Sequence, residues 1–134
     1  MKSFNLITFL EEPTRLQELK TAIARPLEEF RRGRSVRGGV APVELLTQNT
    51  SIPLYRRHVR QLCKWYLEGS LDLVELEYLA SGLDICTDFV PESEELRDAI
   101  SCLSSLGEYG NAEQTVQDVL KSIEREKGIG SVSG

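Results

Sequence analysis

The stretch that decides the fold is residues 54–85, with the sequence LYRRHVRQLCKWYLEGSLDLVELEYLASGLDI. In each half, apolar residues recur every three or four positions, which is the spacing of one face of an α-helix. These positions are Leu54, Tyr55, Val59, Leu62, Trp65 and Tyr66 in the first half, and Leu73, Leu76, Leu79, Ala80 and Leu83 in the second. The pattern predicts two amphipathic helices that form a hairpin.

The turn of this hairpin is Glu68-Gly69-Ser70. Gly69 suits the left-handed conformation in which many helices end, because glycine has no Cβ to clash there. Ser70 suits the N-cap of the second helix, since its hydroxyl can accept a hydrogen bond from a free backbone N–H.

On the N-terminal side, a further helical stripe begins near Thr14 and consists of Leu16, Leu19, Ile23, Leu27 and Phe30. We expect Pro26 to kink or restart this helix and Gly33 to mark its end. Residues 1–12 are apolar, and their pattern leaves a strand and a helix equally open. Residues 31–41 are rich in arginine and glycine, which predicts a mobile basic loop.

Two prolines then suggest helix starts, because proline is favoured at the first position of a helix. Pro42 would begin a short helix, and Pro53 would open the first helix of the hairpin. After the hairpin, Ser93 is a suitable N-cap for a helix whose apolar face is Leu96, Ala99, Ile100 and Leu103.

The last predicted helix begins at Asn111, which forms a capping-box pattern with Gln114. Its apolar face is Val116, Val119, Leu120 and Ile123. Gly128 is expected to end it and residues 129–134 to form a flexible tail. The whole pattern predicts an all-α protein, a single-domain bundle of five or six helices with short connections over residues 1–128.

Composition excludes several classes of protein. The chain is 40% apolar and 28% charged, as in ordinary soluble domains, and no apolar run approaches the roughly 20 residues needed to span a bilayer. The N-terminal run has no signal-peptide cleavage site, so we expect a cytoplasmic protein without a membrane partner.

The chain also has few residues suited to catalysis or metal binding. His58 is the single histidine, and Cys63, Cys86 and Cys102 form no C-x-x-C pair. We therefore expect no metal, no cofactor and no enzymatic activity, with His58 as a surface residue on a basic helix face. No glycine-rich phosphate-binding motif occurs either.

Charge is divided unevenly along the chain. Residues 1–64 hold 12 Lys and Arg against 6 Asp and Glu, whereas residues 65–134 hold 4 against 15. Such asymmetry is a recognised hint of a charged interaction surface, although the two halves could also neutralise each other in the fold. Direct nucleic-acid binding through the arginines is not expected, because the pI is near 5.0 and few aromatic residues lie among them.

Between Glu68 and Asp98 the chain has ten acidic residues and one basic residue, Arg97. Carboxylates around an aromatic anchor suit the binding of a basic protein. The predicted partner-binding residues are Asp72, Glu75, Asp84, Asp88, Phe89, Glu92, Glu95 and Tyr109. A solvated acidic surface, with Phe89 in the core, is an equally open interpretation.

The run Trp65-Tyr66-Leu67-Glu68-Gly69-Ser70-Leu71-Asp72 through Leu76, followed by Leu79-Ala80-Ser81-Gly82-Leu83, resembles a hairpin of small all-helical immunity proteins from bacterial toxin systems. Those systems include contact-dependent growth inhibition. The helix of residues 93–104 and the turn up to Asn111 are also similar, so the resemblance covers residues 54–125.

The resemblance implies a protein that binds and neutralises a cognate toxin, in many cases a nuclease with a basic cleft. The alternative is a non-enzymatic adaptor that binds a partner helix in a groove between the hairpin helices, lined by Trp65 and Tyr66.

Overall fold

The computed structural model describes residues 3–35, 51–86, 88–108 and 111–133, and the statements below concern these parts of the chain. They are mostly helical, which confirms the predicted all-α, single-domain bundle. The α-helices are α1 (Ser3–Glu11), α2 (Leu16–Ser35), α3 (Arg56–Leu67), α4 (Leu73–Ile85), α5 (Glu94–Ser104) and α6 (Ala112–Ser133). Short 3₁₀ helices occupy Pro13–Arg15 and Leu106–Glu108, and the strands are β1 (Ile52–Leu54) and β2 (Phe89–Pro91).

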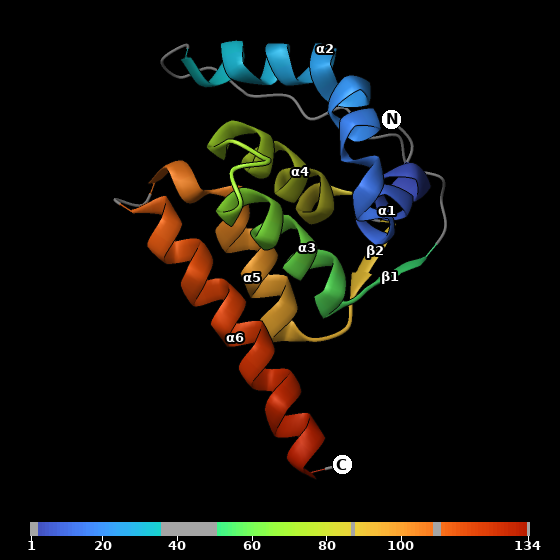
Figure 1. Cartoon of the computed structure of the whole chain (residues 1–134), viewed down its shortest axis with the longest axis vertical. Helices are drawn as coiled ribbons and strands as arrows, with labels where there is room; N and C mark the ends of the chain where they lie inside the picture. The colour runs from blue at the N-terminus through green and yellow to red at the C-terminus, as the bar shows by residue number, and fades with distance from the viewer. Residues whose placement is uncertain (1–2, 36–50, 87, 109–110, 134) are drawn as a thin grey trace.

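Helix α4 is the centre of the bundle (Figure 1). It packs against α2, α3 and α5, while α6 lies along α3 and α5 and α1 packs on α3. Between Glu75 and Leu83 every residue except Ser81 is buried. The prediction of an amphipathic helix with an exposed acidic face is therefore wrong for α4. A helix that is covered on most sides has no solvated stripe.

The hairpin turn confirms the role of Gly69 and corrects that of Ser70. Gly69 has a φ of 84°, in the left-handed region. The N–H of Ser70 donates back to the carbonyl of Trp65 at 2.8 Å, so the chain turns before the next helix starts. The N-cap of α4 is Asp72, whose carboxylate accepts from the N–H of Glu75 at 2.8 Å.

Substitution of Gly69 by alanine is expected to lower the free energy of unfolding by about 1 kcal/mol, the cost of a left-handed residue with a Cβ. The added Cβ would meet no atom within 4 Å, so the cost is in the backbone alone. Gly69→Asn should cost less, because asparagine tolerates this region. Urea denaturation of the three proteins checks the order; equal stability of the alanine variant and the wild type would contradict it.

A strand was considered only for residues 1–12, yet the described chain contains two short strands elsewhere, β1 and β2. Strands β1 and β2 pair in parallel, with Ile52 opposite Phe89 and Leu54 opposite Pro91. Pro53 therefore lies within β1, and α3 begins later than expected, at Arg56 with Tyr55 as its N-cap. Strands of three residues are too short for an alternating pattern to be recognised in the sequence.

The outer edges of this sheet lack hydrogen-bond donors. The N–H of Ile52 donates to the Asp88 carbonyl at 2.7 Å and that of Glu92 to the Leu54 carbonyl at 3.0 Å. Because ladder bonds alternate along a strand, the nitrogens of Pro53 and Pro91 lie on the two open edges, where neither carries a hydrogen. The prolines thus oppose pairing with a further strand.

Near the N-terminus, residues 3–11 form a helix, which settles the choice that the sequence left open. Helix α2 continues through Pro26 without restarting and runs two residues past Gly33, to Ser35. The first part of the predicted basic loop, residues 31–35, is thus helical. Residues 36–50, which include the rest of that loop and the helix expected at Pro42, lie outside the described residues.

At the C-terminal end, Ser93 caps α5 as predicted, because its hydroxyl accepts from the Leu96 N–H at 3.2 Å. Asn111 likewise accepts from the Gln114 N–H at 3.0 Å. The Gln114 side chain, however, donates to Asp118 instead of returning to the cap. Gly128 does not end α6, which continues to Ser133. Within the described chain, no helix is both long and apolar enough to cross a membrane.

Candidate functional site

Two of the predicted binding carboxylates, Asp72 and Glu75, hold the start of α4. Glu75 is only 9% exposed, and it accepts from the N–H of Asp72 at 2.9 Å while Asp72 accepts from that of Glu75. Lys20 lies 3.7 Å from Glu75, and Arg31 donates to Asp72 at 2.7 Å. Burial opposes ionisation of Asp72, yet the Glu75 N–H and the Arg31 guanidinium together lower its pKa. Both carboxylates already have internal partners.

Asp88 and Glu92 lie on either side of β2, and neither is a free surface carboxylate. Asp88 is 1% exposed, so a partner could not reach it. Glu92 accepts from the N–H of Arg56 at 3.2 Å and lies 3.3 Å from its Nε, at the positive end of α3. Of the predicted acidic surface, Glu75 and Asp88 are thus buried, whereas Asp72 and Glu92 are exposed but paired with arginines of the same chain.

The basic and acidic halves of the chain meet across the bundle. Ion pairs that join them include Arg31 to Asp72, Lys20 to Glu75, Arg56 to Glu92 and Arg60 to Glu124. Much of the charge asymmetry is thus neutralised internally. Partly exposed pairs of this kind stabilise a fold by roughly 0–1 kcal/mol each, so they contribute little to the free energy of unfolding.

The remaining predicted binding residues differ in their exposure to solvent. Asp84 is exposed at the end of α4, and Glu95 is exposed in the first turn of α5. Phe89 is 6% exposed and belongs to the core, as the alternative interpretation had it. Tyr109 lies outside the described residues.

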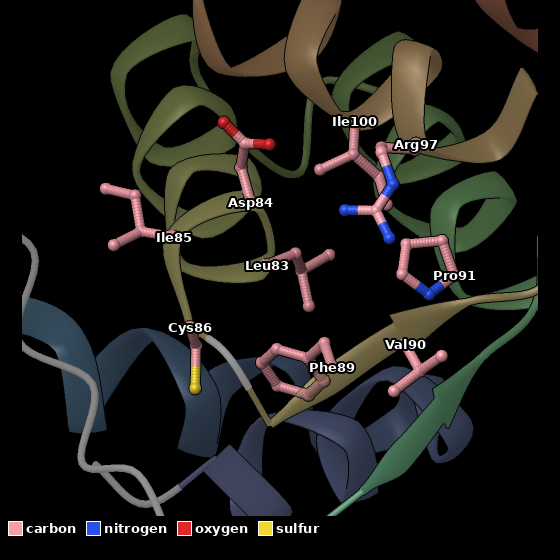
Figure 2. A pocket seen from close by; sticks show the side chains of 9 residues that line it. All are labelled: Leu83, Asp84, Ile85, Cys86, Phe89, Val90, Pro91, Arg97 and Ile100. Atoms are coloured by element: carbon pink, nitrogen blue, oxygen red, sulfur yellow. The ribbon is translucent and has the colours of Figure 1, made fainter. Parts of the chain in front are cut away.

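Asp84 and Phe89 line a hollow of about 330 Å³ between the end of α4, β2 and α5 (Figure 2). The lining residues are Leu83, Asp84, Ile85, Cys86, Phe89, Val90, Pro91, Arg97 and Ile100. Apolar side chains predominate, and the two charged side chains, Asp84 and Arg97, come from different helices. A mostly apolar hollow with a few charged groups is a typical binding surface.

Two aliphatic side chains at this hollow are unusually exposed. Ile85 is 67% exposed and Val90 is 47% exposed, and no other large apolar residue of the described chain is comparably exposed. Both line the same hollow. Single exposed apolar residues are ordinary, but two at one hollow form a patch that a partner could cover.

The charged groups of the hollow are also available. Asp84 and Arg97 are exposed, and neither side chain forms an ion pair or hydrogen bond with a described residue. This distinguishes them from Asp72, Glu75 and Glu92. Their charges are free to pair with groups from outside the chain.

The end of α4 explains how the hollow arises. Its C-cap, Cys86, is extended, with φ −69° and ψ 121°, so the chain leaves the helix and reverses into β2. Side chains alternate along β2, which places Phe89 in the core and Val90 outside. The N–H of Phe89 donates to the Cys86 carbonyl at 3.4 Å and Pro91 has no N–H, so neither backbone nitrogen is available to donate to a ligand.

His58 is not the surface residue predicted from the sequence. It is 1% exposed, and its Nδ1 accepts from the N–H of Tyr55 at 3.0 Å. Its Nε2 is buried and lies 3.7 Å from a Glu11 oxygen, beyond hydrogen-bond distance. Burial, followed by the charge of Arg57, lowers the pKa of His58 against the opposing effect of Glu11. The ring is thus a neutral structural group of the α3 N-terminus.

Metal-ligating side chains are not clustered in the described part of the chain. No group of three or more His, Cys, Asp or Glu side chains within them could hold a metal ion. Cys63 is buried, which raises the pKa of its thiol to about 12 and leaves it unreactive at neutral pH.

A second, smaller hollow of about 220 Å³ is lined by Tyr55, Arg56, Arg57, Arg60 and Glu92. Its guanidinium groups are paired, with Arg57 donating to Glu11 at 2.9 Å and Arg60 lying 3.4 Å from Glu124. The groove expected between α3 and α4 is not open at Trp65, which is only 3% exposed.

Sequence reasoning found Asp84 and Phe89 of the first hollow but missed Ile85, Val90 and Arg97. Ile85 follows the helical apolar stripe and gives no sign that it is exposed. Comparison with known proteins adds no further assignment: no family model, curated protein or solved structure matches the chain.

Proposed function

We propose that this chain is a non-enzymatic binding protein that captures and neutralises a basic partner protein, of the kind represented by a cognate toxin, at the hollow between α4, β2 and α5. The observation that carries the proposal is that Ile85 and Val90, the two most exposed large apolar residues of the described chain, line the same hollow as Asp84, which has no ion-pair partner among the described residues.

Charge around the hollow favours a basic partner. Glu94, Glu95 and Asp98 are exposed in the first half of α5, and Arg97, which lines the hollow, is the one basic residue among them. The net charge of −5 has the same sign. Such a surface accelerates the approach of a basic protein, which matters for an inhibitor that must act before its target does.

The apolar character of the hollow supports the second candidate, an adaptor that binds an apolar helix of a partner subunit. The two candidates differ in their dependence on salt. The association rate of a basic toxin should fall steeply as the salt concentration rises, whereas docking of an apolar helix should change little.

The test is to express the product of the neighbouring reading frame with and without this chain and to measure toxicity and complex formation. The double substitution Ile85→Ser, Val90→Ser should weaken binding about tenfold or more, because large apolar side chains that a partner covers provide much of the binding energy of an interface. Circular dichroism should show an unchanged fold, since both side chains are exposed.

A matched pair of charge variants serves as the control. Asp84→Asn should slow association, whereas Glu113→Gln, which removes an exposed carboxylate in the first turn of α6, should not. If the doubly substituted protein binds as tightly as the wild type, the hollow is not the binding surface. Absence of both toxicity and a complex would contradict the toxin-neutralising function itself.

A further inference from the structure

The smaller hollow at the start of α3 has a strongly positive lining. Arg56, Arg57 and Arg60, all from the first two turns of α3, line it together with Tyr55 and Glu92. None of these residues lines the hollow between α4, β2 and α5. Three positive charges therefore meet one negative charge at a surface that is separate from the proposed partner-binding surface.

The placement of these arginines is unfavourable for α3 itself. Arg60 follows Arg57 by three positions and Arg56 by four, so the cationic side chains are neighbours on the helix and repel one another. They also lie at the N-terminal end of α3, where the backbone is positively polarised and the first turn contains no acidic residue. An anion in the hollow would relieve both effects.

Arg57 has N–H donors that its internal contacts do not use. Its Nη2 donates to Glu11 at 2.9 Å, and its guanidinium lies 4.6 Å from the centre of the Tyr55 ring. A guanidinium has five N–H donors in a fixed plane, so this hydrogen bond leaves most of them for another acceptor. Glu11 does not line the hollow, and its charge therefore does not occupy that space.

Arg60 lacks an acceptor altogether among the described residues. Its side chain is only 21% exposed, yet it donates no hydrogen bond to them, and its buried Nε lies 3.4 Å from Glu124 without forming one. Polar groups that are largely removed from water are normally hydrogen-bonded, so this guanidinium is an exception that needs a cause. A bound anion would supply the acceptor for its terminal nitrogens.

We propose that this hollow binds a phosphate group, which accepts from Arg57 and Arg60 and is attracted by the charge of Arg56. A phosphate group has about 1.5 to 2 negative charges at neutral pH and presents several acceptor oxygens, so it can contact more than one guanidinium at once. A carboxylate presents fewer oxygens and a smaller charge. Glu92, the one carboxylate of the lining, is already held by the N–H and the Nε of Arg56, at 3.2 and 3.3 Å.

The phosphate group can belong to a free phosphate compound or to a lipid headgroup, because both present the same oxygens. The net charge of −5 opposes adsorption on an anionic bilayer, which makes a free compound the expected source. The hollow, of about 220 Å³, has room for such a group. Affinity should be modest, with a dissociation constant of about 1 µM or weaker, because a phosphate ion has few atoms with which to make contacts.

The test is a nuclear magnetic resonance titration of the isotopically labelled chain with sodium phosphate at neutral pH and constant ionic strength, with sodium chloride as the control salt. Phosphate, but not chloride, should cause saturable shifts of the amide signals of Arg56 and Arg57 and of the side-chain Nε–H signal of Arg60. Arg57→Gln and Arg60→Gln should each raise the dissociation constant about tenfold or more, because each removes charge-assisted hydrogen bonds to the anion.

The matched control is Arg32→Gln, which removes an arginine that is also paired with a carboxylate, that of Glu28. It belongs to the end of α2, which lies away from the start of α3 (Figure 1), so phosphate affinity should not change. Circular dichroism checks that each variant is folded. If a variant does not fold, the wild-type titration still decides, because the shifted signals must be those of α3.

Vesicles of phosphatidylcholine with phosphatidic acid distinguish the two sources. Binding to these vesicles that is lost in Arg57→Gln and Arg60→Gln, without a response to inorganic phosphate, would assign the hollow to a lipid phosphate. The site would be overturned if neither probe bound, if phosphate shifted only signals outside α3, or if Arg60→Gln bound as tightly as the wild type. The proposed function is unaffected by these results, because no partner protein is present and the two hollows share no residue.

Discussion

Replacement of Leu76 by alanine is expected to lower the free energy of unfolding by about 2–5 kcal/mol, which is a large part of the stability of a small domain. Leu76 is fully buried at 0% exposure in α4, the helix that contacts α2, α3 and α5. Neighbours held by three helices cannot all move to fill the space, so a cavity remains. The cost therefore exceeds that of losing the apolar contact alone.

The measurement is urea denaturation followed by circular dichroism, and Ile85→Ala is the matched control. Ile85 belongs to the same helix but is 67% exposed, so its truncation should change the stability by no more than about 0.5 kcal/mol. Similar losses for the two variants would show that α4 is not the central helix of the bundle.

Acidification below about pH 6.5 is expected to destabilise the protein through His58. The ring is buried and neutral, because its Nδ1 accepts the N–H of Tyr55 and a second proton would turn that acceptor into a donor. The charged groups around it are Glu11 on α1, Arg57 on α3 and Glu92 after β2. Burial and Arg57 outweigh the two carboxylates and lower the pKa of His58 in the folded state.

The sign of the effect follows from this direction. Between the lowered folded pKa and the ordinary value near 6.5, the unfolded chain binds more protons than the folded chain, so stability falls as the pH falls. Above about pH 6.5 the His58 ring becomes neutral in both the folded and the unfolded chain, so stability no longer changes with pH through this residue. The pKa values of Glu11 and Asp72 are also lowered in the fold, but these carboxylates titrate below about pH 4.5.

Urea midpoints measured from pH 5 to pH 7.5 isolate this effect, because the chain has a single histidine. The variant His58→Gln provides the control. A glutamine oxygen at this position can accept the same Tyr55 N–H, as in a capping box, but does not titrate. The slope of stability with pH should vanish in the variant. An equal slope in both proteins would place the acid sensitivity elsewhere.

Much of the fold could be predicted because helix periodicity and caps are local signals. The spacing of Leu62, Leu76 and Leu103 indicated the core, and Gly69 and Ser93 indicated where helices end and begin. Pairing between distant segments is not local. Nothing near Pro53 indicates that it lies beside Val90, so the small sheet could not be predicted and the start of α3 was placed too early.

The candidate site could be predicted only in part, for the same reason. Acidic residues close together in sequence suggested one surface, yet Glu75 and Asp88 are buried and Glu92 is paired with Arg56 on another helix. Whether a carboxylate is free depends on which cations the fold brings near it. Asp84 remains available because the fold brings no described cation within ion-pair distance of it.

The central claim is that the hollow between α4, β2 and α5 is the surface that binds a partner protein. The most direct measurement is backbone amide chemical shifts of the isotopically labelled chain, recorded as the product of the neighbouring reading frame is added. The account predicts that the largest changes occur in residues 84–91 and at Arg97 and Ile100. Changes confined to α6 or to the arginines of α3, with residues 84–91 unaffected, would contradict it.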